Sequence, residues 1–247
     1  MRSKPVFLLA VLLLAGCAAN PARGCSQPGN SGPLYLGSGI TIGIYLPPCY
    51  DPDSSYLYPV LYLLPGMGGT YQDWFDTGLA EVADTLILSR RVPPLIVVTT
   101  DDTGEDLAAP FLIDAVIPYV ERHYPVRADR AHRAVAGGSL GGASAYYLAF
   151  LHPDLFASAG VFGNGLVTGQ EAQIRAWLEA LPSDMKPRLF LNTGEDDTYM
   201  YRQALALIPL LDEYGIEHTE IFGPGRHAGD YWLSNFPAYL PWLAEDW

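Results

Sequence analysis

The 247-residue chain is poor in cysteine and in basic residues, and it lacks the common cofactor motifs. It has three cysteines, no C-x-x-C, no H-E-x-x-H, no Walker A sequence and no histidine pair at ligand spacing, so neither a metal nor a nucleotide cofactor is expected. Lysine and arginine number 14 against 27 acidic residues, which gives a formal net charge of −13. An acidic chain without a Lys/Arg cluster repels phosphate backbones, so we do not expect a nucleic-acid partner.

The N-terminus carries an uninterrupted apolar run, Val6 to Ala15, preceded by two basic residues. This order is typical of an export signal, and the run is too short to span a bilayer comfortably. It ends in Leu14-Ala15-Gly16-Cys17, which resembles a bacterial lipobox, in which the cysteine is diacylated and becomes the mature N-terminus. An ordinary signal peptide cut near Ala18-Ala19 is the alternative. We expect residues 1–17 to be a lipoprotein signal and Cys17 to anchor the protein to a bacterial membrane outside the cytoplasm.

Residues 18–33 contain almost nothing to bury and many turn formers, so we expect a flexible tether there, followed by a single domain at 34–247. Cys25 lies in this segment, and Cys49 lies in the loop after the first expected strand. Outside the cytoplasm a disulfide between them would join the tether to the domain, and two free thiols are the alternative.

Short apolar runs alternate with longer segments of helical periodicity along the remaining chain. This alternation predicts an α/β fold with a mostly parallel central sheet, helices on both faces, and functional residues at the C-terminal ends of the strands. The only room for a lid is 163–187, so the pocket should be shallow and open. The expected strands are Ile40–Leu46, Pro59–Leu64, Leu95–Thr100, His132–Ala136, Ala157–Phe162, Arg188–Thr193 and Thr219–Phe222. The expected helices are Leu79–Arg90, Phe111–Tyr124 with a kink at Pro118, Leu140–Phe150, Gln170–Leu181, Tyr199–Tyr214 and Tyr231–Leu243.

One glycine-rich turn indicates a nucleophile. Gly137-Gly138-Ser139-Leu140-Gly141 matches G-x-S-x-G, in which a serine stands between a strand and a helix. The pentapeptide also arises by chance, but here a buried strand precedes it and a segment rich in Ala, Leu and Tyr follows it. Ser139 is therefore the candidate nucleophile, and a glycine-rich connection in the core is the alternative reading.

A serine hydroxyl needs a histidine to accept its proton and usually a carboxylate to orient that histidine. Where such a turn carries a nucleophilic serine, the acid and then the histidine follow the serine along the chain. Of the five histidines, only His218 and His227 come late enough. His227 is favoured because it lies in a flexible loop beyond the last strand, whereas His218 enters that strand. The carboxylates ahead of it are Glu195, Asp196 and Asp197, among which the pattern alone does not choose.

Hydrolysis of an acyl compound also needs N–H donors for the tetrahedral oxyanion. One is the backbone N–H of Leu140, and the second is expected in a loop after an early strand. The glycine-rich stretch 63–69 fits this loop, where the N–H of Met67, or that of Gly66, would be the donor. Three aromatic residues are expected to line or support the pocket, although core packing explains each of them at least as well. They are Trp74, Tyr231 and Trp232.

Several motifs in one order resemble the esterase D-like branch of the α/β-hydrolases, which holds feruloyl and acetyl xylan esterases, S-formylglutathione hydrolases, enterochelin esterases and mycolyltransferases. The resemblance covers about residues 44–232. It rests on YLPPCYD (45–51), YPVLYLLPGMGG (58–69) with Trp74, IPYVERHYPV (117–126), AVAGGSLGGASAYYLAFLHPDLFASAG (134–160), NTGEDD (192–197) and GPGRHAGDYW (223–232).

The resemblance implies an acid three residues after the strand-ending glycine, which selects Asp197, and a second oxyanion donor at Met67. The chain departs from the family at Pro65-Gly66, where the family often has His-Gly. It departs again at Cys49, where glycine is frequent, and this change alongside Cys25 favours a specific disulfide.

We therefore expect a membrane-tethered serine esterase that acts outside the cytoplasm on a small-molecule or saccharide ester. Ser139 would attack the ester carbonyl, His227 would transfer the proton, Asp197 would hold His227, and water would release the acid. An acyltransferase of the mycolyltransferase type, in which a hydroxyl group replaces water, would use the same residues. A non-catalytic surface binding protein on a hydrolase scaffold is the remaining alternative.

Overall fold

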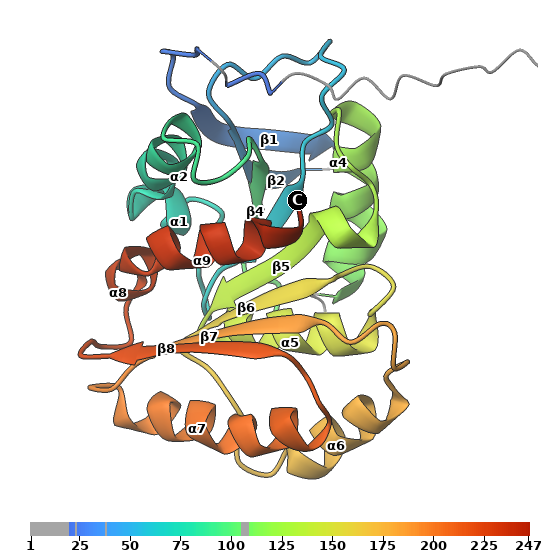
Figure 1. Cartoon of the computed structure of the whole chain (residues 1–247), viewed down its shortest axis with the longest axis vertical. Helices are drawn as coiled ribbons and strands as arrows, with labels where there is room; N and C mark the ends of the chain where they lie inside the picture. Colours follow the sequence, from blue (N-terminus) through green and yellow to red (C-terminus); the bar gives the residue numbers. More distant parts are fainter. Residues whose placement is uncertain (1–19, 23, 38, 105–108) are drawn as a thin grey trace, which may run out of the picture.

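The computed structural model describes residues 20–22, 24–37, 39–104 and 109–247, so the expected signal peptide and Cys17 lie outside the described residues. Within them, eight strands form one sheet in the order β1-β2-β4-β3-β5-β6-β7-β8 (Figure 1). The strands are β1 Asn30–Gly37, β2 Ile40–Leu46, β3 Val60–Leu64, β4 Ile96–Thr99, β5 Arg133–Gly138, β6 Ser158–Phe162, β7 Arg188–Gly194 and β8 His218–Gly223. The helices are α1 Asp73–Asp76, α2 Leu79–Leu88, α4 Ile117–His123, α5 Leu140–Leu151, α6 Glu171–Ala180, α7 Thr198–Glu213, α8 Gly229–Ser234 and α9 Phe236–Leu243.

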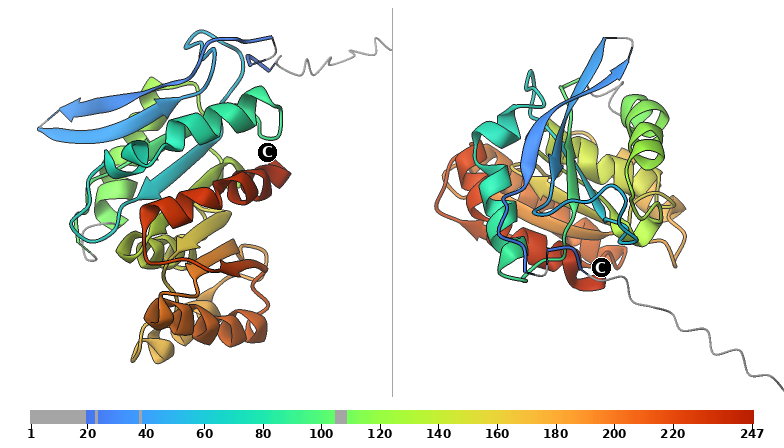
Figure 2. Two further views of the ribbon diagram at one scale, coloured as in Figure 1. Left: turned by 90° about the vertical axis from the view of Figure 1, so that its left-hand side faces the viewer. Right: turned by 90° about the horizontal axis from the view of Figure 1, so that it is seen from above.

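Six of the strands, β3 to β8, run parallel to one another. β2 pairs antiparallel with β4, and β1 pairs antiparallel with β2 at the edge of the sheet. The hairpin of β1 and β2 extends beyond the helical layers (Figure 2). The predicted α/β fold with a mostly parallel sheet is thus confirmed.

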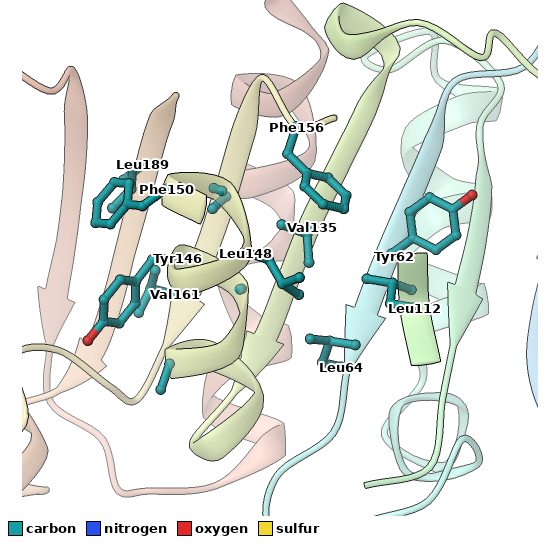
Figure 3. Packing of buried hydrophobic residues seen from close by; sticks show 14 of the residues in the cluster. Tyr62, Leu64, Leu112, Val135, Tyr146, Leu148, Phe150, Phe156, Val161 and Leu189 are labelled. Atoms are coloured by element: carbon teal, nitrogen blue, oxygen red, sulfur yellow. The ribbon is translucent and has the colours of Figure 1, made fainter. Parts of the chain in front are cut away.

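Alternating side chains of the central strands feed two separate cores, as expected for a sheet covered on both faces. Tyr62 and Leu64 of β3 join the core formed with α4, α5, α6 and α7 (Figure 3). Leu61 and Leu63, the intervening residues, join the core formed with α1, α2, α8 and α9. The sheet is therefore a buried, rigid frame for the residues at its edges.

The ordered domain begins earlier than the sequence indicated. Asn30 pairs with Leu46 as the first residue of β1, and the N–H of Gly29 lies 3.0 Å from both carboxylate oxygens of Asp84. The expectation of a flexible tether up to residue 33 is therefore wrong for residues 30–33. Apolar content gave no signal there because an edge strand can be held by its backbone ladder while most of its side chains face solvent.

Three helical predictions differ in detail from the structure. The expected helix 111–124 is a π-helical segment, Phe111–Val116, followed by α4, and Pro118 occupies the first turn of α4, where its missing N–H is tolerated. The last expected helix is divided into α8 and α9 at Asn235. Segment 163–187 holds α6, which is paired with α7 through Arg175 and Glu213, and two of its residues are buried in the core. The segment that offered the only room for a lid is therefore packed on the domain.

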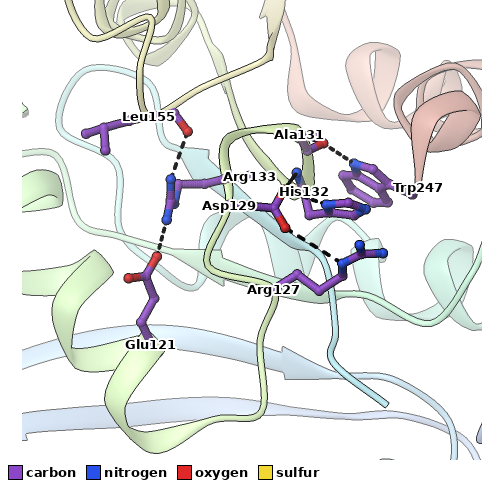
Figure 4. Close-up of polar contacts among 8 residues, drawn as sticks. All are labelled: Glu121, Arg127, Asp129, Ala131, His132, Arg133, Leu155 and Trp247. Atoms are coloured by element: carbon purple, nitrogen blue, oxygen red, sulfur yellow. Dashed lines mark hydrogen bonds and ion pairs between the residues drawn. The ribbon is translucent and has the colours of Figure 1, made fainter. Parts of the chain in front are cut away.

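The disulfide and the C-terminus lie at the N-terminal ends of the parallel strands. Cys25 and Cys49 are joined with an S–S distance of 2.02 Å, just beyond the Asn30–Leu46 pair. Trp247 donates its indole N–H to the carbonyl of Ala131, ahead of β5 (Figure 4). None of the described helices is both long and apolar enough to cross a membrane.

Candidate active site

Ser139 stands between β5 and α5 in a strained backbone conformation, with φ 55° and ψ −118°. The two glycines of the motif are required by close approach rather than by their own dihedrals. A Cβ on Gly137 would lie 2.4 Å from the carbonyl of Gly141, and a Cβ on Gly141 would lie 2.4 Å from the carbonyl oxygen of Pro65. The tight turn therefore presents Ser139 at the C-terminal ends of the parallel strands, as the G-x-S-x-G pattern predicts.

His227 and Asp197 meet at the same edge. Nδ1 of His227, in the loop after β8, lies 2.5 Å from Oδ2 of Asp197, in the loop after β7. The other carboxylate oxygen of Asp197 accepts the backbone N–H of Met200 and so caps α7. Both oxygens of this carboxylate are thus held, which fixes its plane against the imidazole ring.

The alternative acid and the alternative histidine lie elsewhere. Asp196 is exposed and lines a cleft on the other side of the β8–α8 loop. His218 directs Nδ1 to the carbonyl of Ile216, 2.9 Å away, and its Nε2 lies 3.4 Å from Glu220. Among the described residues, neither side chain is hydrogen-bonded to His227, whose carboxylate partner is Asp197.

Trp232 connects the imidazole ring to the nucleophile turn. Its ring lies 5.0 Å from the ring of His227 at an interplanar angle of 90°, and a Cβ on Gly138, next to Ser139, would lie 2.4 Å from it. No hydrogen bond joins Ser139 to His227 within the described residues. Such bonds are often long in a substrate-free hydrolase and shorten when substrate binds.

The loop after β3 lies directly over the serine. A Cβ placed on Gly66 would lie 3.5 Å from Cβ of Ser139. The N–H of Gly69 donates to the carbonyl of Gly66 at 2.9 Å, which closes a turn in which Gly68 has φ +69°. Because a trans peptide directs its N–H away from its C=O, the N–H of Met67 points out of this turn. This N–H therefore takes no part in the hydrogen bond that closes the turn.

Two hollows are lined by neighbours of His227 along the chain. The first, of about 260 Å³, is lined on one side by Pro65, Gly66 and Met67, and on the other by the buried rings of Trp74 and Trp232. The second is a more polar cleft of about 630 Å³. Its lining includes Asp196, Arg226, Asp230 and Tyr231.

Of the three aromatic residues expected near the pocket, Trp74 and Trp232 line the first hollow and Tyr231 lines the second cleft. Trp74 is buried and donates its indole N–H to the carbonyl of Leu64 at 3.1 Å. Tyr231 packs on Gly225 and directs its hydroxyl to the carbonyl of Thr193, and burial raises the pKa of Tyr231. These contacts brace the two loops that carry Met67 and His227. No cluster of three or more metal-ligating side chains is present in the described part of the chain.

Two further polar residues at this edge escaped the sequence analysis. Asp102, after β4, accepts the N–H of Gly68 through Oδ2 at 2.7 Å. Asn164, after β6, donates from Nδ2 to the carbonyl of Ser139 at 2.9 Å. Both follow the C-terminal ends of parallel strands, and that position was the available signal.

A strand-turn-helix serine after the third parallel strand of the sheet, a carboxylate after β7 and a histidine after β8 are arranged as in an α/β-hydrolase fold. Solved structures agree with this fold. A ferulic acid esterase superposes with a TM-score of 0.74 at 24% identity, covering 89% of this chain and 98% of that one. A mutant feruloyl esterase module from Clostridium thermocellum, in complex with sinapinate, gives 0.72 at 22% identity, covering 93% of each chain.

A sequence-family model described as "Putative esterase" matches residues 34–109 and 108–243, and the chain belongs to this esterase family. The endo-1,4-beta-xylanase/feruloyl esterase of Xylanibacter ruminicola is 32% identical over 147 residues, which are 53% of this chain and 20% of that protein. Endo-1,4-beta-xylanase Y of Acetivibrio thermocellus is 32% identical over 124 residues, 44% of this chain and 11% of that protein. The match thus spans a fifth or less of the length of these two relatives.

Proposed function

We propose that this protein is a serine carboxylesterase in which Ser139, His227 and Asp197 form a catalytic triad. The observation that carries the proposal is the 2.5 Å contact between His227 and Asp197 at the strand edge that presents the strained Ser139. Asp197 holds the imidazole with Nδ1 protonated, which leaves Nε2 to accept the serine proton. Membership of the esterase family supports an ester as the substrate.

The reaction proceeds in two halves through an acyl-enzyme. Ser139 Oγ attacks the ester carbonyl as His227 takes its proton, and the oxyanion is stabilised by the N–H groups of Leu140 and Met67. His227 then returns the proton to the departing alcohol. Water, activated by the same imidazole, attacks the acyl-enzyme, and the acid leaves as the proton goes back to Ser139.

The acyl and alcohol parts of the substrate bind in different hollows. The acyl group enters the hollow lined by Met67, one of the two proposed oxyanion donors, where Trp74 and Trp232 offer apolar walls. The alcohol lies on the side of His227, in the cleft with Arg226, Asp196 and Asp230, whose polar groups suit a hydroxylated alcohol such as a saccharide. The structural relative complexed with sinapinate makes an aromatic acid a reasonable first acyl group to try.

We propose further that the enzyme is exported and held at a bacterial membrane through Cys17. The Cys25–Cys49 disulfide favours a compartment outside the cytoplasm, where disulfides persist. It ties the N-terminal segment to the sheet edge opposite Ser139, so an anchored enzyme would direct its active site away from the lipid. Membrane fractionation of Cys17→Ser beside the unaltered protein tests this: equal membrane association of both would reject lipidation at Cys17.

Hydrolysis of p-nitrophenyl acetate tests the triad. Ser139→Ala and His227→Ala should each lower kcat by about 10⁶-fold, because the residues of a triad act as a unit. A fluorophosphonate probe should label the unaltered protein and spare Ser139→Ala. Folded protein that takes up no probe and hydrolyses no ester would reject an enzyme. A screen of acetyl, butyryl, feruloyl and thioester substrates then identifies the acyl group, and transfer to an added alcohol with little free acid would indicate an acyltransferase.

A further inference from the structure

Asn164 is a buried amide whose two polar ends are both used. Its side chain lies in the loop after β6, and the residue is 5% exposed. Nδ2 donates to the carbonyl of Ser139 at 2.9 Å, and Oδ1 accepts the N–H of Gly165 at 2.7 Å. Burying an amide is costly unless it is hydrogen-bonded, so its two bonds define a single orientation for the side chain.

The carbonyl that Asn164 contacts belongs to the same peptide unit as the proposed oxyanion donor. Ser139 contributes the C=O of that unit and Leu140 contributes the N–H. The unit is planar and trans, so holding the oxygen at one end directs the N–H at the other end the opposite way. As the first residue of α5, Leu140 has no carbonyl partner within the helix for this N–H.

We propose that Asn164 is a positioning residue that aims the Leu140 N–H at the oxyanion, a role that rests on the proposed esterase function. The carbonyl of Ser139 also accepts the N–H of Gly142 at 2.9 Å and that of Ala143 at 3.2 Å. The two N–H groups of α5 therefore already satisfy this carbonyl. The third hydrogen bond, from Asn164, serves to fix the orientation of the peptide unit. A hydrogen bond to the C=O also polarises the peptide and strengthens its N–H as a donor.

The loop that carries Asn164 is held on three sides. The carbonyl of Gly165 accepts the hydroxyl of Tyr146, from α5, at 2.9 Å. The N–H of Leu166 donates to the carbonyl of Gln203, in α7, at 2.9 Å. The N–H of Gly163 donates to the carbonyl of Asn192, in β7, at 2.7 Å. The amide of Asn164 thus starts from a fixed base, and the same loop joins the nucleophile turn to the helix that Asp197 caps.

Two substitutions distinguish a role of Asn164 in orienting the Leu140 N–H from a role in folding. Asn164→Ala removes the donor and should lower kcat and kcat/KM alike by about tenfold to 10²-fold, since loss of an oxyanion donor outright costs about 10²-fold to 10³-fold. KM should change less than about threefold, because the interaction acts only on the transition state. Asn164→Asp keeps the shape but turns an ionised oxygen toward the carbonyl of Ser139. Once protonated, that carboxyl can donate a hydrogen bond again.

The pH dependence of kcat distinguishes a positioning role from a structural one, because a purely structural role of Asn164 would not change it. The ratio of the kcat of Asn164→Asp to that of the unaltered enzyme should rise as pH falls, because pH effects common to the two enzymes cancel in this ratio and only the variant gains a donor when its carboxyl is protonated. Gln203→Glu is the matched control: it is the same amide-to-acid change in an 8%-exposed residue packed on the same loop, without contact to Ser139. Its kcat should stay within about twofold of the unaltered value, below the melting temperature of each variant.

Four outcomes decide between the two proposals. An unaltered protein that neither reacts with a fluorophosphonate nor hydrolyses esters rejects the esterase itself. An active enzyme in which folded Asn164→Ala retains kcat within twofold rejects the positioning role alone. A kcat ratio for Asn164→Asp that stays flat between pH 5 and pH 8 also rejects the positioning role, and so does a loss of kcat in Gln203→Glu equal to that in Asn164→Asp. If Asn164→Ala does not fold, these two measurements still test the role.

Discussion

The carboxylate of Asp197 is shared between an imidazole and a helix: Oδ2 lies 2.5 Å from Nδ1 of His227, and Oδ1 accepts the N–H of Met200 at the start of α7. The acid is thereby oriented by secondary structure rather than by a flexible loop alone. This arrangement separates the two roles of the side chain, because an amide can cap a helix but cannot stabilise an imidazolium in the same way.

Asp197→Asn should therefore lower kcat for p-nitrophenyl acetate by about 10⁴-fold, with the imidazole held in the wrong tautomer, while the melting temperature hardly changes. Asp196→Asn is the control, because Asp196 is exposed and is not hydrogen-bonded to His227. The nitrophenol of p-nitrophenyl acetate also lacks the hydroxyl groups that the cleft beside Asp196 is proposed to bind. Asp196→Asn should keep kcat within about twofold. Equal rates for Asp197→Asn and the unaltered enzyme, with the large loss in Asp196→Asn, would reassign the acid.

The second oxyanion donor depends on a carboxylate from another strand. Asp102 accepts the N–H of Gly68 at 2.7 Å and donates its own N–H to the carbonyl of Gly69 at 2.9 Å, so it clamps the turn that presents Met67. Asp102→Ala should loosen this turn and lower kcat about tenfold, a fraction of the cost of losing a donor outright.

Asp101→Ala is the comparison for that change, because Asp101 accepts the N–H of Tyr71, outside the turn, at 2.8 Å. Steady-state kinetics of both variants should show a fall in kcat for Asp102→Ala with KM nearly constant, and little change for Asp101→Ala. A rise in KM with kcat intact would indicate that Asp102 serves substrate binding and leaves the oxyanion unaffected.

The sequence predicted the parts of this site that depend on chain order and local pattern. The G-x-S-x-G turn is a local pattern and the choice of His227 follows from chain order, whereas Asp197 was selected from three adjacent carboxylates by the resemblance to the esterase family. The structure brings these three residues to the C-terminal ends of the strands. Asn164 and Asp102 could not be identified in this way. Their importance lies in which backbone group each touches across 25 and 34 residues of chain, and an amide or a carboxylate after a strand is common in loops.

The same limit applies to the fold. Periodicity located the buried strands because both of their faces are apolar. It missed β1, which is held to β2 by backbone pairing and leaves most of its side chains in solvent. It also joined α8 to α9, because both are apolar and only the turn at Asn235 divides them.

A charge pair ahead of β5 predicts how stability depends on pH. Burial pushes the pKa of Asp129 upward, but the hydrogen bonds and charge of His132, with Arg127 nearby, outweigh it and leave that pKa below its ordinary value (Figure 4). Since the folded-state pKa is depressed, the stabilisation is complete above the unfolded pKa of about 4 and is lost as pH falls through the folded value. The unfolding free energy of the unaltered protein should exceed that of Asp129→Asn above pH 4, and the difference should close below it.

Urea unfolding between pH 2 and pH 7 measures this difference, with the exposed Asp154→Asn as the control. The control should show no pH-dependent gap of comparable size. A gap for Asp129→Asn that stays constant down to pH 2 would mean that the carboxylate charge of Asp129 adds nothing beyond its shape.

The disulfide predicts a stability change without a change in catalysis. It closes a loop with a sequence separation of 24 residues, and chain-entropy estimates give about 3 kcal/mol for a loop of this size. Cys25→Ser should lower the melting temperature by roughly 10 °C for a domain of this length. Because the bridge lies at the edge opposite Ser139, kcat at 25 °C should be unchanged. A fall in kcat at a temperature where the variant is fully folded would contradict this separation.

Cys49 allows a sharper test, because it occupies a left-handed conformation with φ 53° that costs a side-chain-bearing residue about 1 kcal/mol. Once Cys25 is replaced, the thiol of Cys49 no longer offsets this cost, and glycine suits the position better. The double variant Cys25→Ser, Cys49→Gly should therefore melt a few degrees above Cys25→Ser alone. The gain is partly offset because glycine raises the conformational entropy of the unfolded chain. The pair Cys25→Ser, Cys49→Ala is the matched control, since it removes the same thiol and keeps the Cβ. If the alanine variant is as stable as the glycine variant by calorimetry, the backbone at residue 49 is unstrained, and the bridge accounts for the whole effect.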